Sequence, residues 1–526
     1  MTALPRRNLL LSGAALSAAA ALGPSPLAAA QPVTVSRHRV DRGISRRTIN
    51  RWAADTWASL VAMTDEKTGL TADNIEGPLG NPTRSGYTSP TNIGGYLWSA
   101  IVAREMGIIS ARECTRRLRQ TMKTLKRMAH HGPSGMYYNW YDERDGSVLR
   151  KWPTDGNVVY PFLSSVDNGW LAAALMVVEN ADPAVARLAR SISEPMTFAA
   201  YYDPHPDPID GREFVSGLLH GGFWDEQPPG AHKPGNYLGV GPDVFYTLNH
   251  YDTTVSETRI ASYIAIARGQ VPAAHYFATF RTFPRGKYFS WQEQRPVGTT
   301  RHYLGLPVFE GAYQYRGMRI VPGWGGSMFE ALMPNMFVPE ESWGPRSWGV
   351  NHPLTVRAHR EHGLDDAKYG FWGFSPASRP GGGYSEWGVD AIGLNSGGYP
   401  SDMEHTNYDI GYPGYRPATN PNPNYGDGVI TPHALFLAMH HEPRAAYRNL
   451  IKVRDELEAY GDGGFYDAIA VKTGVVARRY LSLDQAMIMG SIGNVFAARV
   501  IQRAFCRGAI RRSIKPLLAL ERFSAG

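Results

Sequence analysis

The chain alternates between amphipathic helical segments and long loops rich in glycine and aromatic residues, and this alternation limits the folds open to it. The clearest helical pattern starts at Ser110, where Ser110 and Glu113 form a capping box and apolar residues follow at spacings of three and four. The other expected helical segments are 92–106, 168–179, 183–196, 256–268, 432–440, 443–460 and 483–504. Helix pairs joined by such long loops favour an all-α toroid whose loops build a cleft at one end.

Composition fits one large globular domain rather than a disordered chain or a coiled coil, because 43% of the 526 residues are hydrophobic and 19% are charged. No low-complexity linker follows residue 45, so a single domain is expected over residues 45–520. Strand signals at 135–141 and 316–321 are short and are interpreted as loop hairpins.

The net charge of +7 is too small for a chain of 526 residues to indicate a nucleic-acid partner. The densest basic stretch is interpreted as a solvated helical face; it comprises Arg499, Arg503, Arg507, Arg511, Arg512 and Lys515.

The N-terminus has the features of an export signal. Arg6-Arg7 precedes an Ala- and Leu-rich run that ends in three alanines at residues 28–30. This pattern predicts a twin-arginine signal peptide over residues 1–30 and a secreted, cell-envelope or periplasmic mature protein. A short membrane anchor is the alternative, which Pro24 and Pro26 disfavour. No later run approaches twenty apolar residues, so no membrane span is expected in the mature protein.

Several kinds of chemistry lack their sequence patterns here. No phosphate-binding loop, nucleophile elbow or zinc-protease motif is present, and the histidines have no ligand-like spacing, so neither a metal site nor a cofactor is expected. Cys114 and Cys506 are the only cysteines, and their pairing is left open. What remains is carboxylates in glycine- and aromatic-rich loops, the groups that glycoside hydrolysis requires.

Seven short motifs then identify a resemblance. They lie at residues 88–94, 137–142, 164–169, 251–259, 325–330, 369–375 and 483–485. In this order they resemble the loops of the bacterial glucoamylase-like family, which includes endo-β-1,2-glucanases and a domain of cyclic β-1,2-glucan synthases. The resemblance runs from about residue 85 to about residue 495. It implies an (α/α)6 toroid and a polysaccharide or oligosaccharide substrate.

The resemblance implies that Glu257 is the general acid and that Asp484 is the base that activates water. From the residues alone, Glu257 could instead complement a helix dipole, and Asp484 could be a helix N-cap. An acid needs a raised pKa, and a neighbouring aromatic ring such as that of Tyr251 would raise the pKa of Glu257 by desolvation.

The remaining candidates are substrate-binding residues in the same loops: Asp167, Trp140, Tyr251, Trp324, Glu330, Trp372 and Glu386. Asp167 could equally cap a helix, and each tryptophan could be either a sugar platform or a packed loop anchor. Glu330 is interpreted as a binding or structural residue.

One departure from the family concerns stereochemistry. In cyclic-glucan synthases, the motif that resembles residues 372–375 is followed by a glutamate nucleophile, but Pro376 stands there in this chain. Unless Glu386 replaces that nucleophile, the expected reaction is inverting hydrolysis of a β-glucan, β-1,2-linked by preference, with carboxyls roughly 6.5–9.5 Å or more apart. The alternatives are a hydrolase of the same fold that acts on another polysaccharide, and a non-catalytic glycan-binding protein.

Overall fold

The computed structural model describes residues 43–207, 214–283, 294–394 and 425–526. The expected signal peptide at residues 1–30 lies outside this part of the chain. Within the described ranges, no helix combines the length and the apolar character that a membrane crossing needs.

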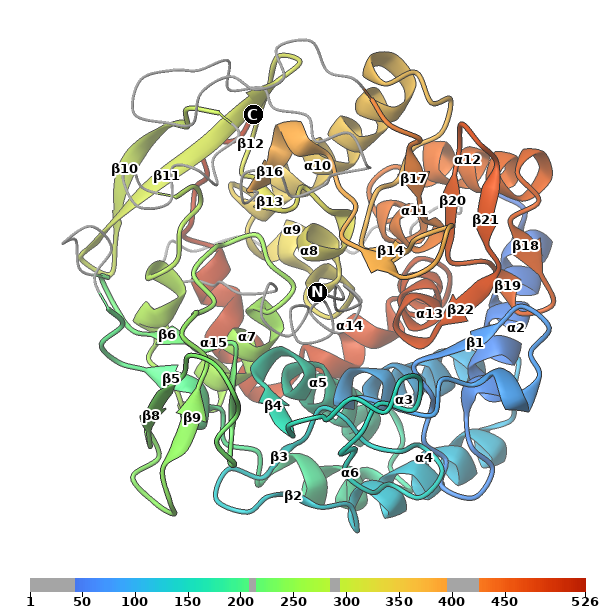
Figure 1. Cartoon of the computed structure of the whole chain (residues 1–526). Helices are drawn as coiled ribbons and strands as arrows, with labels where there is room; N and C mark the ends of the chain where they lie inside the picture. Colours follow the sequence, from blue (N-terminus) through green and yellow to red (C-terminus); the bar gives the residue numbers. More distant parts are fainter. Residues whose placement is uncertain (1–42, 208–213, 284–293, 395–424) are drawn as a thin grey trace, which may run out of the picture.

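Six helices surround the middle of the molecule (Figure 1): α3 (Pro90–Glu105), α5 (Ser165–Ala181), α7 (Arg259–Ala267), α8 (Met328–Leu332), α11 (Pro432–Ala438) and α13 (Ser482–Phe496). Helix α3 packs on both α5 and α13, α5 packs on α7, and α11 packs on α8 and α13. Small residues allow these close approaches. A Cβ atom at Gly169 of α5 would lie 2.9 Å from the side chain of Ala261 in α7.

A second set of helices lies farther out: α2 (Arg46–Met63), α4 (Ala111–Leu125), α6 (Ala186–Ser193), α10 (Trp348–Glu361), α12 (Pro443–Glu456) and α15 (Gly508–Leu518). Helix α2 packs on α13, α4 on α3, and α6 on α5. Helix α10 packs on α8, α12 on α11, and α15 on α7. The N-cap half of the predicted capping box is confirmed, because the Glu113 N–H donates to Ser110 Oγ at 3.1 Å. The Glu113 carboxylate pairs with Arg116 and Arg117. Two short helices, α9 (Glu340–Trp343) and α14 (Val500–Phe505), complete the set within the described residues.

Several predicted helix boundaries are wrong. The segment expected over 183–196 forms the shorter α6, and the one expected from residue 168 already begins at Ser165. The segment 483–504 is not one helix, because Ala498 and Arg499 adopt positive φ angles of 52° and 56° and separate α13 from α14. Helix α12 ends at Glu456, since Tyr460 already pairs in a strand. Helix α7 begins at Arg259, so the residues just before it form a turn.

The all-α description is incomplete, because the long loops pair into small sheets. The largest are a four-stranded sheet of β4 (Phe162–Ser164), β7 (Gly222–Trp224), β9 (Val244–Tyr246) and β8 (Lys233–Gly235), and a three-stranded sheet of β10 (Val297–Tyr303), β11 (Leu306–Tyr315) and β12 (Met318–Ile320). Such pairing satisfies backbone groups that long loops would otherwise leave without partners.

The other sheets of the described chain have two or three strands each. They are β1 (Asn74–Glu76) with β22 (Arg479–Leu481), β2 (His130–His131) with β3 (Met136–Tyr137), β5 (Tyr202–Asp203) with β6 (Leu218–Leu219), β13 (Gly323–Trp324) with β16 (Gly393–Leu394), β14 (Ala377–Ser378) with β15 (Tyr384–Ser385), β18 (Tyr460–Gly461) with β19 (Gly464–Phe465), and β17 (Val429–Ile430) with β20 (Ala468–Ala470) and β21 (Val475–Ala477).

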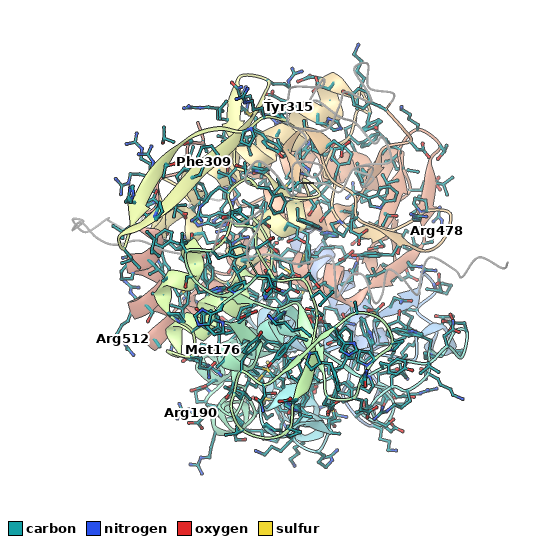
Figure 2. The ribbon with its side chains drawn as sticks, turned by 60° about the vertical axis from the view of Figure 1, so that its left-hand side comes forward. Met176, Arg190, Phe309, Tyr315, Arg478 and Arg512 are labelled. Carbon is teal, nitrogen blue, oxygen red and sulfur yellow. The ribbon has the colours of Figure 1, made fainter. Side chains whose placement is uncertain are left out.

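One hydrophobic cluster runs from Ile44 to Phe523 and so joins the two ends of the described chain. Both cysteines are free thiols, which answers the open question of their pairing. The C-terminal basic stretch is exposed as predicted, except that Arg499 is half-buried, and Figure 2 shows Arg512 pointing away from the body of the molecule.

Candidate functional site

Acidic side chains gather where the N-terminal ends of the central helices meet. Thr91 Oγ1 of α3 donates to Asp167 Oδ1 of α5 at 2.6 Å. The N–H of Glu257, just before α7, donates to Glu330 Oε2 of α8 at 2.7 Å. Asp484 of α13 has its Oδ2 atom 3.1 Å from Nδ1 of His433 in α11. These contacts bring the helix starts together in pairs, α3 with α5, α7 with α8, and α11 with α13, and helix dipoles favour negative charge at such ends.

Glu257 lies in the turn before α7 and is 4% exposed. Its Oε2 atom accepts a hydrogen bond from Trp170 Nε1 of α5. Burial raises the pKa of Glu257 well above its usual range, and the negative charges of Glu330 and Asp167 raise it further. This shift favours the protonated carboxyl, the state that a general acid requires.

Tyr251 lies near Glu257 and is fully buried. Burial raises the pKa of its phenol well above the usual range, and the charge of Glu257 raises it further. Desolvation of Glu257 by this ring stays a prediction. At 0% exposure, Tyr251 offers no surface to a sugar ring.

Glu330 follows the N-cap Ser327 of α8 and is also 4% exposed. Burial raises the pKa of Glu330 to about 7, with a further rise from Glu386 and opposing effects from the Glu257 N–H and Ser256. Sequence reasoning treated Glu330 as a binding or structural residue, whereas the structure places its carboxylate directly on the backbone of Glu257.

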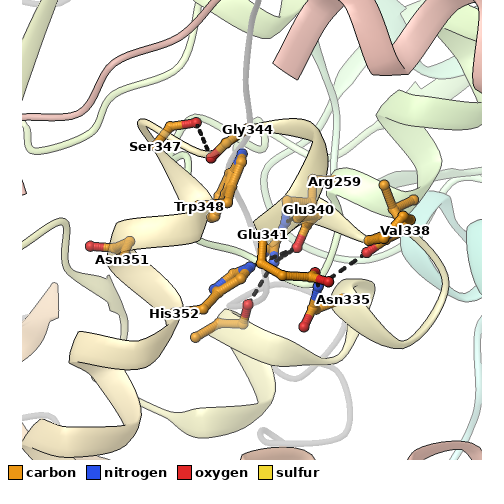
Figure 3. Close-up of polar contacts among 12 residues, drawn as sticks. Arg259, Asn335, Val338, Glu340, Glu341, Gly344, Ser347, Trp348, Asn351 and His352 are labelled. Carbon is orange, nitrogen blue, oxygen red and sulfur yellow. Dashed lines mark hydrogen bonds and ion pairs between the residues drawn. The ribbon is translucent and has the colours of Figure 1, made fainter. Parts of the chain in front are cut away.

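Arg259 fastens the turn that carries Glu257 to helix α8. Its guanidinium makes a bidentate pair with Glu340, through Nε to Oε1 at 2.6 Å and Nη2 to Oε2 at 2.9 Å. Its Nη1 donates to the carbonyl oxygens of Ser256 and Glu330 at 2.7 and 2.8 Å. The ring of Trp348 lies 4.4 Å from the guanidinium carbon, and Figure 3 shows this packing.

The Arg259–Glu340 pair is fully buried. Tyr263 Oη donates a hydrogen bond to Glu340 Oε1 at 2.7 Å, and His352 Nε2 lies 3.0 Å from Glu340 Oε2. Burial acts to raise the pKa of Glu340, but Arg259 and His352 lower it to about 2, so the carboxylate is ionised. The pair is therefore a positioning device for the acid end of the site. The sequence did not predict this pair, because its two members are 81 residues apart and share no motif.

Replacing Glu340 by glutamine should leave the buried guanidinium charge of Arg259 without its carboxylate partner. The expected loss is about 3–5 kcal/mol of unfolding free energy, the scale for removing one partner of a buried ion pair. Thermal denaturation checks it, with Glu105→Gln as the control, because that carboxylate pairs with Arg104 at the surface and should matter by less than about 1 kcal/mol. Equal melting temperatures for the two variants would contradict this role.

Asp484 lies in the first turn of α13, where Leu481 is the N-cap residue, so the N-cap interpretation is wrong. Asp484 is 4% exposed. Burial raises the pKa of Asp484 to about 7; the charge of Asp73 raises it too, while the adjoining Asp467 lowers it. Near neutral pH this group can take up and release a proton, as a general base must.

Asp467, just before β20, is a functional candidate that the sequence did not reveal. Burial and the charge of Asp484 raise the pKa of Asp467 well above its usual range. A proton shared by this carboxyl pair therefore favours Asp467, which leaves Asp484 the more readily ionised of the two. The Ser378 N–H donates to Asp467 Oδ2 at 2.7 Å and fixes its orientation. Burial lowers the pKa of the neighbouring His433 to about 4, so that imidazole is neutral.

Asp167 is half-buried, and its carboxylate accepts from Thr91. It is not the cap of α5, because Ser164 Oγ accepts the Asp167 N–H at 3.1 Å. Glu386 is half-buried and acts electrostatically on Glu330 and on the phenol of Tyr384, which also senses Asp484. Asp167 therefore lies near Glu257, and Glu386 lies near Glu330 and near Tyr384, on which the charge of Asp484 also acts.

The three tryptophans differ in burial. Trp372 is 2% exposed within the main core, and its carbonyl oxygen accepts from Asn449 Nδ2. Trp324 is 7% exposed and packs in a small loop cluster. Both positions have the burial of loop anchors. Trp140 is half-buried against Tyr87 and Trp152, so for Trp140 contact with a sugar stays a prediction.

Comparison with known families gives two matches. Residues 300–508 match the family described as "Putative glucoamylase", and residues 51–200 match "Protein of unknown function (DUF3131)". Cyclic beta-(1,2)-glucan synthase NdvB of Rhizobium meliloti (strain 1021) is 24% identical over 550 residues, covering 84% of this chain. The chain spans 17% of the length of that curated relative.

Solved structures share the fold at low identity. The endo-β-1,2-glucanase from Chitinophaga pinensis, in complex with sophorotriose and glucose, is 16% identical with a TM-score of 0.58, covering 90% of this chain and 98% of that chain. The β-1,2-glucanase from Parabacteroides distasonis is 13% identical with a TM-score of 0.62, covering 90% and 60%. The endo-β-1,2-glucanase from Talaromyces funiculosus, in complex with sophorose, is 13% identical with a TM-score of 0.57, covering 90% and 91%.

The family match and the shared fold therefore confirm the resemblance to the glucoamylase-like family that the sequence motifs indicate.

Proposed function

We propose that this protein is a glycoside hydrolase that cleaves a β-glucan, β-1,2-linked by preference. The observation that carries the proposal is the presence of two buried carboxyls, Glu257 and Asp484, each 4% exposed, in the helical frame. Burial raises the pKa of Glu257 well above its usual range and that of Asp484 to about 7. The substrate class rests on the solved structures of similar fold, which are β-1,2-glucanases. We further propose that the two sets of helices form an (α/α)6 toroid and that the long loops form the substrate cleft.

In the proposed reaction, the Glu257 carboxyl donates its proton to the glycosidic oxygen as the bond to the anomeric carbon breaks. Asp484 takes a proton from the water molecule that attacks this carbon from the opposite face. Asp467 and Tyr384 would orient Asp484, and Glu330 would hold the turn of Glu257 through its N–H. The products are two shorter glucans, and exchange with solvent returns the proton to Glu257.

The electrostatic surroundings of the two carboxyls support inversion. The charges that act most strongly on Glu257 are those of Glu330, Asp167 and Arg259. On Asp484, a hydrogen bond with Asp467 lowers the pKa and the charge of Asp73 raises it. Carboxyls as close as the roughly 5 Å of a retaining pair would be expected to perturb each other's pKa strongly. Separate surroundings agree with a pair that leaves room for water.

Release of reducing ends tests the proposal. Purified enzyme is incubated with linear β-1,2-, β-1,3- and β-1,4-glucans and with an α-glucan, and we expect release from the β-1,2-glucan above all others. Preferential release from another glucan would refute the linkage assignment alone. Binding of a glucan with no release from any of the panel would refute the enzymatic proposal.

The dependence of activity on pH follows from the two raised pKa values. Asp484 must be ionised to act as base, so kcat/KM should fall about tenfold per pH unit below about pH 7. Glu257 must be protonated, so activity should persist into the alkaline range. A kcat/KM that stays constant down to pH 5 would contradict the assignment of Asp484.

We also propose that the protein is exported through the twin-arginine route. Substitution of Arg6→Lys together with Arg7→Lys should keep the precursor in the cytoplasm, as cell fractionation and immunoblotting would show. Arg511→Lys with Arg512→Lys is the matched control, because these exposed neighbours lie on α15. Normal export of the first double variant would overturn the proposal.

A further inference from the structure

Three polar side chains that are far apart in the sequence converge beside the four-stranded sheet. They are Asp203 at the end of β5, His220 between β6 and β7, and His250 after β9. One carboxylate oxygen and two imidazole nitrogens, one from each residue, lie within 4.8 Å of one another. Their separations of 17 and 30 residues follow no metal-binding motif, which is why the sequence predicted no metal site.

The geometry of this cluster is close to that of a metal-ligand set. Asp203 Oδ2 lies 3.1 Å from His250 Nε2 and 3.6 Å from His220 Nε2. Ligand atoms bound tetrahedrally to zinc at about 2.0–2.1 Å are about 3.3 Å from each other. The two distances to the carboxylate oxygen bracket that value. His220 Nε2 also lies 3.3 Å from Tyr237 Oη, and a bound ion would replace this hydrogen bond.

The surrounding residues hold the cluster in place. The His205 N–H donates to the other carboxylate oxygen of Asp203 at 3.0 Å, which leaves Oδ2 to face the imidazoles. The ring of His220 stacks on that of Tyr246 at a centroid distance of 4.8 Å, and the ring of His250 lies tilted against it at 4.0 Å. Because the three donor side chains are held by packing and backbone contacts, little order would have to be gained on binding.

A cation already lies against this carboxylate. Lys233 Nζ, at the start of β8, is 3.3 Å from Asp203 Oδ2, and its side chain is 37% exposed. Asp203 and His220 are buried, whereas His250 is 12% exposed at the side-chain level. The open side of the cluster is therefore the side of Lys233 and His250, where a flexible ammonium can swing into solvent.

We propose that Asp203, His220 and His250 form a binding site for a divalent transition-metal ion of the zinc type, in competition with the Lys233 ammonium. Two imidazoles and one carboxylate are a ligand set that zinc accepts, and a water molecule would complete four-coordination. Tyr251 follows His250 directly and lies near enough to Glu257 for the charge of Glu257 to raise the pKa of its phenol. The ion would thus tie down the segment that leads into the acid end of the proposed site.

The test uses the full mature chain, stripped with a chelator and titrated with Zn²⁺ by calorimetry. We expect one equivalent of Zn²⁺ per chain and a melting temperature that rises with Zn²⁺ concentration. His250→Ala should weaken binding at least about tenfold. His232→Ala is the matched control, because His232 is half-buried just before β8 and lies outside the cluster; it should bind like the wild type.

Lys233→Met separates a metal site from a merely hydrogen-bonded cluster, since it removes the competing cation and retains all three ligands. This variant should bind Zn²⁺ more tightly than the wild type. Co²⁺ in place of Zn²⁺ should give the visible absorption of a tetrahedral site, lost in His250→Ala. Absence of saturable Zn²⁺ binding in both the wild type and Lys233→Met, or equal affinities of His250→Ala and His232→Ala, would overturn the proposal.

Discussion

Glu257→Gln should lower kcat on β-1,2-glucan at least about a hundredfold, the usual scale for losing a general acid. The amide has nearly the shape of the protonated carboxyl and can still accept from Trp170 Nε1, but it has no acidic proton to donate. Fold and substrate binding should therefore persist. Initial rates of reducing-end release, together with glucan affinity by calorimetry, measure the two effects separately.

The control for this variant is Glu66→Gln, which makes the same chemical change at an exposed position. A Glu257→Gln enzyme within a fewfold of the wild type would show that another group donates the proton. Glu330 would then be the first to examine, because its pKa of about 7 also allows a protonated fraction at neutral pH.

Asp484→Asn should be comparably inactive, because an amide cannot accept the proton of the attacking water. Its effect on stability should differ from that of a lost helix cap. A carboxyl whose pKa is raised by folding opposes folding once the pH exceeds its unfolded value, from about pH 4 upward, so an uncharged replacement removes that penalty. At pH 8 the melting temperature should thus be equal to or above that of the wild type.

Comparison of Asp484→Asn with a variant that lacks a helix cap therefore distinguishes a catalytic role of Asp484 from a structural one. Ser110→Ala removes a true N-cap, that of α4, and should lower stability by about 1 kcal/mol with unchanged kinetics. If Asp484→Asn behaved like Ser110→Ala, with reduced stability and normal kcat, Asp484 would be a structural residue and the base would lie elsewhere.

Much of the helical frame could be predicted, since most of the expected segments carry a periodic apolar face and a cap. The segment at Ser110 shows this best. Helix α8 was missed because five residues are too few to show a period. Helix α2 was missed although Ile49, Trp52 and Leu60 do follow helical spacing. The break at Arg499 was missed because its positive φ angle depends on how α13 and α14 pack.

In the site, the acids that stand inside family motifs were predictable, and their partners were not. Glu257 and Asp484 lie in short motifs, whereas Asp467 gains its meaning only from its contact with Asp484 across the fold. Arg259 stands within a motif, but its role depends on Glu340, which is 81 residues away. Burial made the same kind of difference for Trp372, because one sequence context allowed both a sugar platform and a core anchor.

Proton NMR of the enzyme acting on linear β-1,2-glucan tests hydrolysis and stereochemistry in one time course. If Glu257 protonates the leaving oxygen while Asp484 activates water, the first reducing-end signals to appear must be those of the α-anomer, with the β-anomer following by mutarotation. Absence of any new reducing-end signal would contradict hydrolysis of this glucan. Appearance of the β-anomer first would contradict inversion and would point to a carboxylate nucleophile, with Glu386 as the acid to replace.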